Sequence, residues 1–451
     1  MLGLIVKNED GSAQTEDIIF KQGAATKLAE VLVNSKIPFI EQQIDKTVVN
    51  VQADINAIGS SAFEILQKAP GLSITGDDVI NMSGKAGVNV LIDGRPTQMS
   101  SKELANYLRS LPGSTIEKIE LISNPSSRFD AQGNAGIINF GQQVKKFEYQ
   151  LGVRVENAAV SGNSVDLKNN NIKNPDTNYI NIFPTAFVSY KLNEKNIFAL
   201  SYSKRINRPD YQSLNPFETI YDIYTSEKGN PYLRPQYTNN FELKYTYKYA
   251  INVAVGFNHT KDYSQTISRQ IGQLTTATND NIGTLDNAYL SISSPLPINK
   301  WWDGYLNVTG FINHYKGMLA NGKLDENVLG MNYYIQQNFK PGKGWSMQLS
   351  SWYNAGTKEA IFKTSWLGSV DFGIKKSLLN SKASIRLTML DIFNTQRWQQ
   401  KVQFANQDFT YRRKWESRGL RLQISWSFGK TEYKARERET SKDANRIKIK
   451  S

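Results

Sequence analysis

Beyond residue 146 the chain is dominated by long runs in which apolar and polar residues alternate. In the clearest run, Phe241, Leu243 and Tyr245 alternate with Glu242 and Lys244, and the stretches 251–258 and 420–428 repeat the pattern. Because successive side chains of a strand point to opposite faces, each run predicts a strand with one apolar and one polar face. The runs reach the roughly 9–11 residues that a tilted strand needs to cross a membrane. We therefore expect a transmembrane antiparallel β-barrel with about twelve strands between 147 and 429.

The connections between these runs also alternate, in length. Short turns are expected at 192–196, 249–250, 341–344 and 379–381, and long polar connections at 162–177, 207–233 and 270–282. Barrels of the outer membrane have short periplasmic turns and long external loops, which is the pattern seen here. The alternative is a soluble β-sandwich or solenoid, which would use shorter strands and bury its apolar faces between sheets.

The preceding part of the chain has a different pattern and predicts a small α+β domain over 36–142. Strands are expected at 47–51, 88–93, 116–123 and 136–140, and helices at 61–68 and 102–110. Ser100 and Glu103 form a capping-box sequence for the second helix, and Pro112-Gly113 ends it. Residues 1–35 read as a linker, 143–430 as the barrel and 431–451 as a charged tail. The expected fold is therefore mainly β.

Aromatic residues support this boundary. The chain has 8 Trp, 22 Tyr and 20 Phe, yet only six of them fall in the first 140 residues, and every Trp lies at or after Trp301. Amphipathic rings are favoured at membrane–water interfaces, where barrel walls carry them. The mean hydropathy of −0.47 agrees with alternating strands. No run of 18 apolar residues predicts a transmembrane helix.

The chemistry of the remaining residues argues against an enzyme. Cysteine is absent, and the two histidines, His259 and His314, have no metal-ligand spacing to other donors, so we expect no metal and no cofactor. No nucleophile elbow, P-loop or dinucleotide fingerprint is present. The net charge of +13 is spread along the chain, so nucleic acid is not an expected partner. Asp77-Asp78 reads as a solvated turn, with ligand contact as the alternative, and the first residues do not read as a signal peptide.

Several segments, taken in order, resemble a TonB-dependent outer-membrane receptor of the Bacteroidetes-type outer-membrane β-barrel family. In the α+β domain these are IEQQIDKTVVNV (40–51), AFEILQKAPGL (62–72), VLIDGRP (90–96), IEKIELISNP (116–125), SRFDA (127–131) and GIIN (136–139). In the barrel they are LGVRVE (151–156), YSKRINRP (202–209) and GNPYLRP (229–235). Each motif alone is weak, whereas their order and spacing over a hundred residues are specific.

The resemblance implies a plug domain at 36–142 and energised uptake of a scarce ligand, such as a siderophore, vitamin, glycan or peptide. It implies TonB with its inner-membrane energising complex, the barrel-assembly machinery and outer-membrane lipid as partners, and the Gram-negative outer membrane as the location. Glu30, Val31, Leu32 and Val33 stand where a TonB box is expected, although they could equally form a short edge strand. The plug-motif residues are Asp93, Gly94, Arg95, Asn124, Pro125, Arg128 and Gly136.

The chain departs from this family in its number of strands. Family barrels have about 22 strands around a plugged lumen, and the runs here correspond to the C-terminal half. A closed twelve-strand barrel has a backbone radius of roughly 12 Å, too small for a 100-residue plug with a radius of gyration of about 13 Å. The strands could close with the plug outside, form an open half-barrel around it, or belong to a truncated and inactive receptor. The alternative functions are a passive or structural barrel without TonB coupling and a soluble binding module made from the plug.

Overall fold

A computed structural model describes residues 5–7, 13–15, 39–43, 46–57, 59–74, 78–84, 88, 90–93, 95–97, 99–123, 135–161, 164–166, 171–173, 176–319, 322–359, 362–380, 382–404 and 407–426. The chain divides into two units, Met1–Ile37 and Pro38–Ser451. In the first, β1 (Ile5–Lys7) pairs with β2 (Ala13–Thr15). The second contains the sheet and the plug. In the described part of the chain, no helix is long and apolar enough to cross a membrane.

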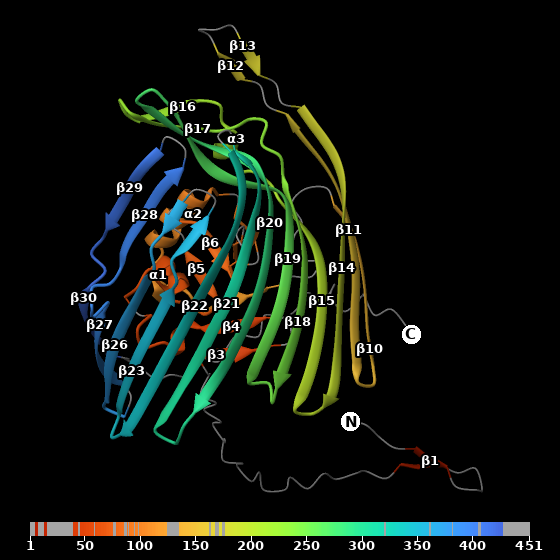
Figure 1. Ribbon diagram of the computed structural model, residues 1–451. Helices are drawn as coiled ribbons and strands as arrows, with labels where there is room; N and C mark the ends of the chain where they lie inside the picture. Colours follow the sequence, from red (N-terminus) through yellow and green to blue (C-terminus); the bar gives the residue numbers. More distant parts are fainter. Residues whose placement is uncertain are drawn as a thin grey trace. The chain divides into compact units, whose positions relative to one another are not determined.

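The second unit is dominated by one antiparallel sheet whose neighbours follow the order of the chain (Figure 1). Its strands are β10 (Ala135–Val144), β11 (Phe147–Ser161), β14 (Asp176–Asn193), β15 (Asn196–Asn207), β18 (Gln236–Tyr247), β19 (Ile251–Ile271), β20 (Leu274–Pro297), β21 (Trp302–Leu319), β22 (Gly322–Gly342), β23 (Trp345–Asn354), β26 (Leu367–Leu378), β27 (Ala383–Leu390) and β30 (Gly419–Trp426). The expected twelve strands after residue 146 are those from β11 to β30, so the mainly β fold and the strand number are confirmed.

The first strand of the sheet lies where the sequence placed the end of the plug. The predicted strand at 136–140 is present, but it belongs to β10, which pairs along its whole length with β11. In the structure the sheet therefore begins at Ala135, seven residues before the boundary at 142. The predicted boundary rested on the rise in aromatic content, and it fell after this strand because β10 has a single aromatic residue, Phe140.

The two faces of the sheet have the polarity of a membrane wall. On β18, Phe241 and Leu243 are 47% and 51% exposed, while Glu242 between them is only 8% exposed. A soluble protein would have the reverse arrangement, because apolar side chains are normally the buried ones. The outward face of the sheet is therefore the lipid-facing one, and the inward face carries polar side chains.

A β-bulge reverses this arrangement above the lipid-facing band. The β19–β20 register shifts between Thr260 and Tyr263, where Asp262 has a positive φ. One extra residue moves the following apolar side chains to the other face. Tyr263 and Ile267 consequently point inward, in an apolar cluster with residues of β20–β22 and with Phe362 and Val402 of external hairpins. The same long strands thus present apolar side chains to lipid at one end and pack them against protein at the other.

The ends of the strands differ as expected. Tight turns join β14–β15, β18–β19, β22–β23 and β26–β27 at one end, and most of the longer connections lie at the other (Figure 1). These contain β12 (Ser164–Asp166), β13 (Asn171–Lys173), α3 (Tyr211–Leu214), β16 (Glu218–Asp222), β17 (Thr225–Lys228), β24 (Thr357–Glu359), β25 (Phe362–Thr364), β28 (Arg397–Phe404) and β29 (Gln407–Lys414). The long loop expected at 270–282 is wrong: β19 and β20 continue to Ile271 and Leu274, because polar residues also suit strands that stand in water.

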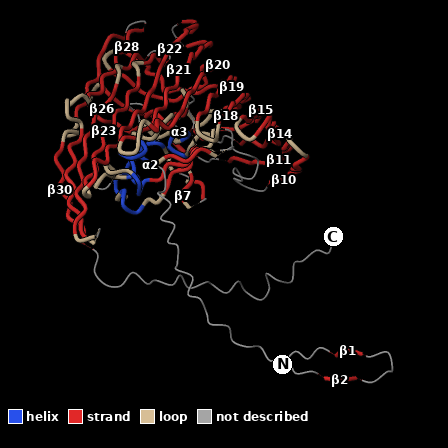
Figure 2. The backbone as a smooth tube through the Cα atoms, turned by 90° about the horizontal axis from the view of Figure 1, so that it is seen from below, coloured by secondary structure: helices blue, strands red, loops and turns tan. Residues whose placement is uncertain are grey.

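The plug is a separate α+β body on the concave side of the sheet (Figure 2). It contains β3 (Ile40–Gln42), β4 (Thr47–Asn50), η1 (Val51–Ala53), α1 (Ala62–Gln67), β5 (Leu72–Ile74), β6 (Ile80–Met82), β7 (Leu91–Ile92), β8 (Arg95–Pro96), α2 (Ser101–Ser110), η2 (Gly113–Thr115) and β9 (Lys118–Leu121). The capping box of Ser100 and Glu103 is present. Its largest apolar cluster, which includes Ala62, Phe63 and Leu108, is built from plug residues alone.

The sheet is an open one. Among the described residues, β10 pairs only with β11 and β30 only with β27, so these two strands are its edges. Figure 2 shows the sheet as an arc with the plug inside it and β10 and β30 at the two ends. Of the three arrangements that the strand number allowed, the structure has the open sheet around the plug.

Candidate functional site: the interface between plug and sheet

Buried polar groups join the plug to β23 of the sheet. The backbone amide of Ile55 donates to Gln348 Oε1 at 2.7 Å, and Gln348 Nε2 donates to Asp54 Oδ1 at 2.7 Å. Two residues further along β23, Ser350 Oγ accepts from Asn56 Nδ2 at 3.0 Å. Gln348 and Ser350 lie two residues apart on β23 and therefore share its inward face. The segment after β4 thus docks on one strand through directed hydrogen bonds.

An ion pair fixes the end of α1 to the next strand of the wall. Lys68 Nζ lies 2.5 Å from Asp371 Oδ2 on β26, with side chains 14% and 1% exposed. The other oxygen of Asp371 accepts from Ser369 Oγ and from the backbone amide of Asp391, each at 2.8 Å. A buried carboxylate needs this full set of partners, because removing a charge from water is costly.

A second ion pair lies at the edge of the sheet. Arg421 of β30 donates to Ser60 Oγ at 2.9 Å and lies 3.3 Å from Glu64 of α1. Both charged side chains are partly exposed, so the pair contributes less than the Lys68–Asp371 pair. Polar contacts to the plug therefore extend along the wall from β23 to β30.

The carboxyl of Asp54 has a pKa that is shifted by its burial. Burial raises the pKa of its carboxyl above the usual value, while hydrogen bonds from Asn56 and Gln348 and the charge of Lys68 oppose that shift. Its stabilising contribution is present below pH 3.8 and is lost as the pH rises through the raised pKa. At neutral pH this residue therefore works against the docked plug.

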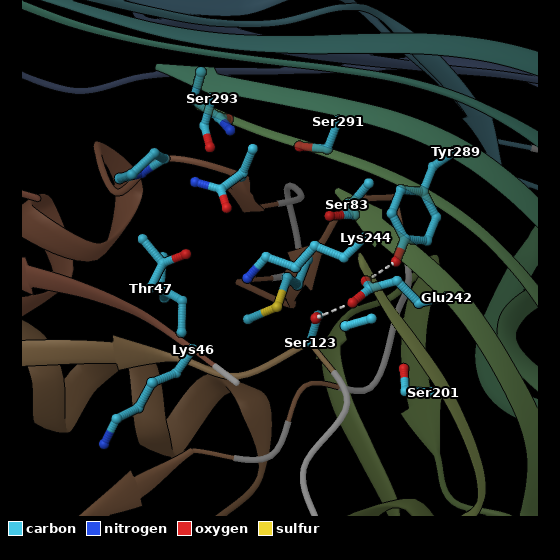
Figure 3. A pocket seen from close by; sticks show the side chains of 18 of the residues that line it. Lys46, Thr47, Ser83, Ser123, Ser201, Glu242, Lys244, Tyr289, Ser291 and Ser293 are labelled. Carbon is cyan, nitrogen blue, oxygen red and sulfur yellow. Dashed lines mark hydrogen bonds between the residues drawn. The ribbon is translucent and has the colours of Figure 1, made fainter. Parts of the chain in front are cut away.

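A cavity of about 120 Å³ lies between the plug and strands β14–β21 near the short-turn end (Figure 3). Glu242 projects from β18 between plug and wall: Ser123 Oγ donates to its Oε1 at 3.1 Å, and the Tyr289 hydroxyl donates to its Oε2. Nearby, Lys244 Nζ donates to the carbonyl of Gln43 at 3.1 Å. Polar and apolar side chains from both bodies thus line a small space along the wall.

A larger cavity of about 250 Å³ lies between α1, α2 and the hairpin β28–β29. Arg109 sits 4.2 Å from the centre of the Phe63 ring and 2.6 Å from Asp78. Across the cavity are Trp398 and Arg413. The Trp398 indole nitrogen is buried without a hydrogen-bond partner among the described residues. Aromatic faces beside guanidinium groups suit a planar ligand that carries negative charge.

Few of the residues singled out from the sequence lie at this interface. Asp93 is exposed in the turn between β7 and β8, Arg95 pairs with Ile92, and Gly136 pairs with Val155 in the sheet. Outside the described residues lie Gly94, Asn124, Pro125, Arg128, Glu30, Val31, Leu32 and Val33. The predicted plug-motif and TonB-box roles stay predictions. Among the described residues, no group of three or more His, Cys, Asp or Glu side chains could hold a metal ion.

The interface residues that sequence reasoning missed are polar residues inside strands. Gln348, Asp371 and Glu242 each stand at an inward position of an alternating strand. A carboxylate such as Asp371 within LGSVDFGI is a usable signal, because only a wall that faces another protein body would keep it buried. The partner of such a residue, here Lys68 about 300 positions away, has no signature in the sequence.

A plug held by polar contacts on the inner face of a lipid-facing antiparallel sheet defines a plugged outer-membrane barrel protein. The family model for the outer membrane protein beta-barrel family matches residues 109–426, so the chain belongs to that family and to the outer membrane. No curated protein matches the sequence.

Two solved structures share this fold at low sequence identity. The siderophore receptor PirA from Pseudomonas aeruginosa is 12% identical, with a TM-score of 0.53 over 82% of this chain and 98% of that chain. A mutant of the ferric enterobactin receptor PfeA from Pseudomonas aeruginosa, in complex with enterobactin, is 10% identical, with a TM-score of 0.54 over 78% and 94% of the two chains. At these identities the likeness establishes the fold, which is the receptor fold that the motifs indicated.

Proposed function

We propose that this protein is a TonB-dependent receptor that takes up a scarce ligand across the outer membrane. The observation that carries the proposal is the nature of the interface: the plug has its own apolar core and is joined to the wall by directed hydrogen bonds, beside one apolar cluster of Phe39 and Ile40 with residues of β21, β22, β23 and β26. Water can replace a broken hydrogen bond, so each such contact contributes only about 0.5–1.5 kcal/mol. A body joined in this way can be pulled from its seat without unfolding.

The cavity between α1, α2 and β28–β29 is the proposed ligand site. It lies toward the end with the long connections, which is the external end in barrels of this class. The two structures that share the fold are receptors for a siderophore and for ferric enterobactin, so iron–siderophore complexes are the first ligands to test. A ligand with acidic and aromatic groups would match Arg109, Arg413 and the Trp398 ring.

Coupling of uptake to TonB is the central test of this proposal. Deleting residues 30–33 should abolish ferric-siderophore uptake in energised cells while the protein still inserts in the outer membrane. A matched deletion of residues 23–26, from the same stretch, should leave uptake unchanged. If uptake continues without 30–33, those residues are not the TonB box.

A passive barrel is the competing function, and a truncated, inactive receptor is the other. A passive barrel would give solute flux in reconstituted vesicles without TonB, and that flux would be unaffected by either deletion. An inactive receptor would insert and bind but show no uptake. The plug seated over the inner face supports the energised transporter over the passive barrel, because an open pore has no use for it, and the uptake measurement separates it from the inactive receptor.

A further inference from the structure

Two basic side chains stand next to each other on the inward face of the wall. Lys375 of β26 and Arg386 of β27 are register partners, and both are partly buried. Within the described part of the chain neither forms an ion pair or a side-chain hydrogen bond, and Arg386 Nη1 is buried without an acceptor. Like charges directly opposite each other destabilise a sheet, and a buried guanidinium nitrogen normally has an acceptor. The arrangement therefore costs free energy that a purely structural wall would avoid.

This pair of cations lies on the same two strands as the proposed ligand cavity. Leu367 of β26 and Leu390 of β27 line that cavity, and the inward positions after them lead to Lys375 and Arg386. At about 3.3 Å per residue, the distance along β27 from Leu390 to Arg386 is roughly 13 Å. The short turn that joins the two strands begins directly after Leu378, so the pair lies toward the periplasmic end of the wall.

The docked plug separates the cavity from the pair of cations. Lys68, which lines the cavity, is held by Asp371 on β26. At the next inward position, Gly373 lies so close to the plug that an added Cβ atom would be 2.4 Å from Asn56 Oδ1. Lys375 is the inward residue after that. Along these strands, an anion therefore reaches the pair from the cavity only after this part of the plug has moved.

We propose that Lys375 and Arg386 form a second binding site, which receives the acidic group of the transported ligand on the periplasmic side of the plug. This assignment rests on the proposed transport function and gives the ligand a charge: it carries a carboxylate or a similar oxyanion. The planar guanidinium group binds two oxygens of such a group, and the ammonium group of Lys375 adds a second positive charge.

Movement of the plug also changes the electrostatics of this site. The charge of Asp54, which belongs to the plug, acts on Arg386 while the plug is docked. When the segment that carries Asp54 moves away, this attraction is lost, because it falls with distance. The two cations then attract an anion more strongly at the moment when the passage toward them opens.

The test places a single thiol beside the pair, in a chain that contains no cysteine. Ser384→Cys lies two residues from Arg386 on β27, on the same inward face. In the purified protein, its rates of modification by an anionic and by a cationic methanethiosulfonate are measured, with and without citrate as a tricarboxylate probe. The measurement is repeated with Lys375→Gln and Arg386→Gln, singly and together. Lys376→Gln, which removes a charge from the adjacent outward position beside the Trp345 ring, is the matched control.

Relative to a free thiol, the anionic reagent is expected to react roughly tenfold faster than the cationic one, because two positive charges lie nearby. Citrate should slow the anionic reagent. Both effects should disappear in the combined variant and persist in Lys376→Gln. The combined variant should fold as well as the wild type, because it removes a repulsion between like charges. Equal protection by citrate in the combined variant, or no preference for the anionic reagent with the wild-type pair, would overturn the proposal.

Uptake by energised cells tests the role of the pair in transport. The combined variant should bind a ferric siderophore at the cell surface as the wild type does but take it up more slowly, while Lys376→Gln takes it up normally. Unchanged uptake in the combined variant would overturn this role. If the wild type itself takes up no siderophore, the proposed function fails, and the labelling result still decides whether the pair binds an anion.

Discussion

Lys68 at the end of α1 and Asp371 on β26 form an ion pair at 2.5 Å that is buried between the plug and the wall. The carboxylate is 1% exposed, so its charge is stabilised by the protein alone. Removing one member of such a pair leaves the other charge buried and uncompensated. The strength with which the plug is held therefore depends on this pair more than on any exposed one.

Lys68→Met is expected to weaken plug docking by about 3–5 kcal/mol. The measurement is the urea concentration at which the plug of the detergent-solubilised protein becomes accessible to protease. Lys102→Met, which breaks the exposed Lys102–Glu227 pair, is the control and should cost no more than about 1 kcal/mol. The double variant Lys68→Met with Asp371→Leu should recover most of the loss. Equal midpoints for Lys68→Met and Lys102→Met would contradict the assignment.

Asp54→Asn is expected to stabilise the docked plug at pH 7. Burial raises the pKa of Asp54, so ionising its carboxyl in the docked plug costs free energy, whereas Asn keeps an oxygen that accepts from Asn56 and Gln348 and carries no charge. The difference should fade as the pH drops toward 3.8, where the wild-type group is protonated. The same urea–protease assay at pH 4 and pH 7 measures it.

Glu103→Gln is a control whose effect on plug stability should depend on pH in the opposite direction to that of Asp54→Asn. Hydrogen bonds from Ser100 lower the pKa of Glu103, so its contribution is present above the ordinary pKa of 4.5 and is lost as the pH falls through the lowered value. Its substitution should therefore weaken the plug at pH 7 and matter less in acid. A pH dependence of the same sign in both variants would count against the Asp54 assignment.

Gly84→Ala is expected to push the plug away from β21. Gly84 has φ +77, and a Cβ atom there would lie 2.6 Å from the ring of Phe311. Overpacking of this kind costs about 1–3 kcal/mol. Gly272→Ala separates this clash from backbone strain, because Gly272 has φ +61 but open space around it.

Protease accessibility of the plug should rise in Gly84→Ala and not in Gly272→Ala. Adding Phe311→Leu to Gly84→Ala should restore protection by making room. If the double variant is as accessible as the single one, the close approach of Gly84 and Phe311 does not position the plug.

Leu422→Arg is expected to impair membrane insertion of the sheet. A basic side chain on the lipid face of a barrel costs about 2–4 kcal/mol near the bilayer midplane. Gln423→Arg, one residue along β30 on the other face, should be tolerated. Folding into lipid vesicles, followed by the heat-dependent shift in electrophoretic mobility, measures both, and equal loss in the two variants would reverse the assignment of the faces.

The sequence by itself determined the strands, the faces and the separate plug. Alternation in segments such as 241–245 is a local property, because each side chain's face follows from its position along the strand. The capping box of Ser100 and Glu103 is local too, and the helix begins directly after the predicted N-cap Ser100, one residue before the predicted start. The twelve strands and their lipid-facing residues could therefore be predicted.

Only the tertiary structure decided what the inward face holds and how far the wall extends. Lys68 and Asp371 lie about 300 residues apart, and their pairing depends on how the arc curves around the plug, which no local pattern encodes. Likewise, the strand pattern of β10 does not show whether it belongs to the plug or to the sheet. Its hydrogen bonds to β11, rather than its hydrophobicity, place it in the sheet. The open edges follow from that pairing, because register and neighbours are set by contacts across the whole sheet.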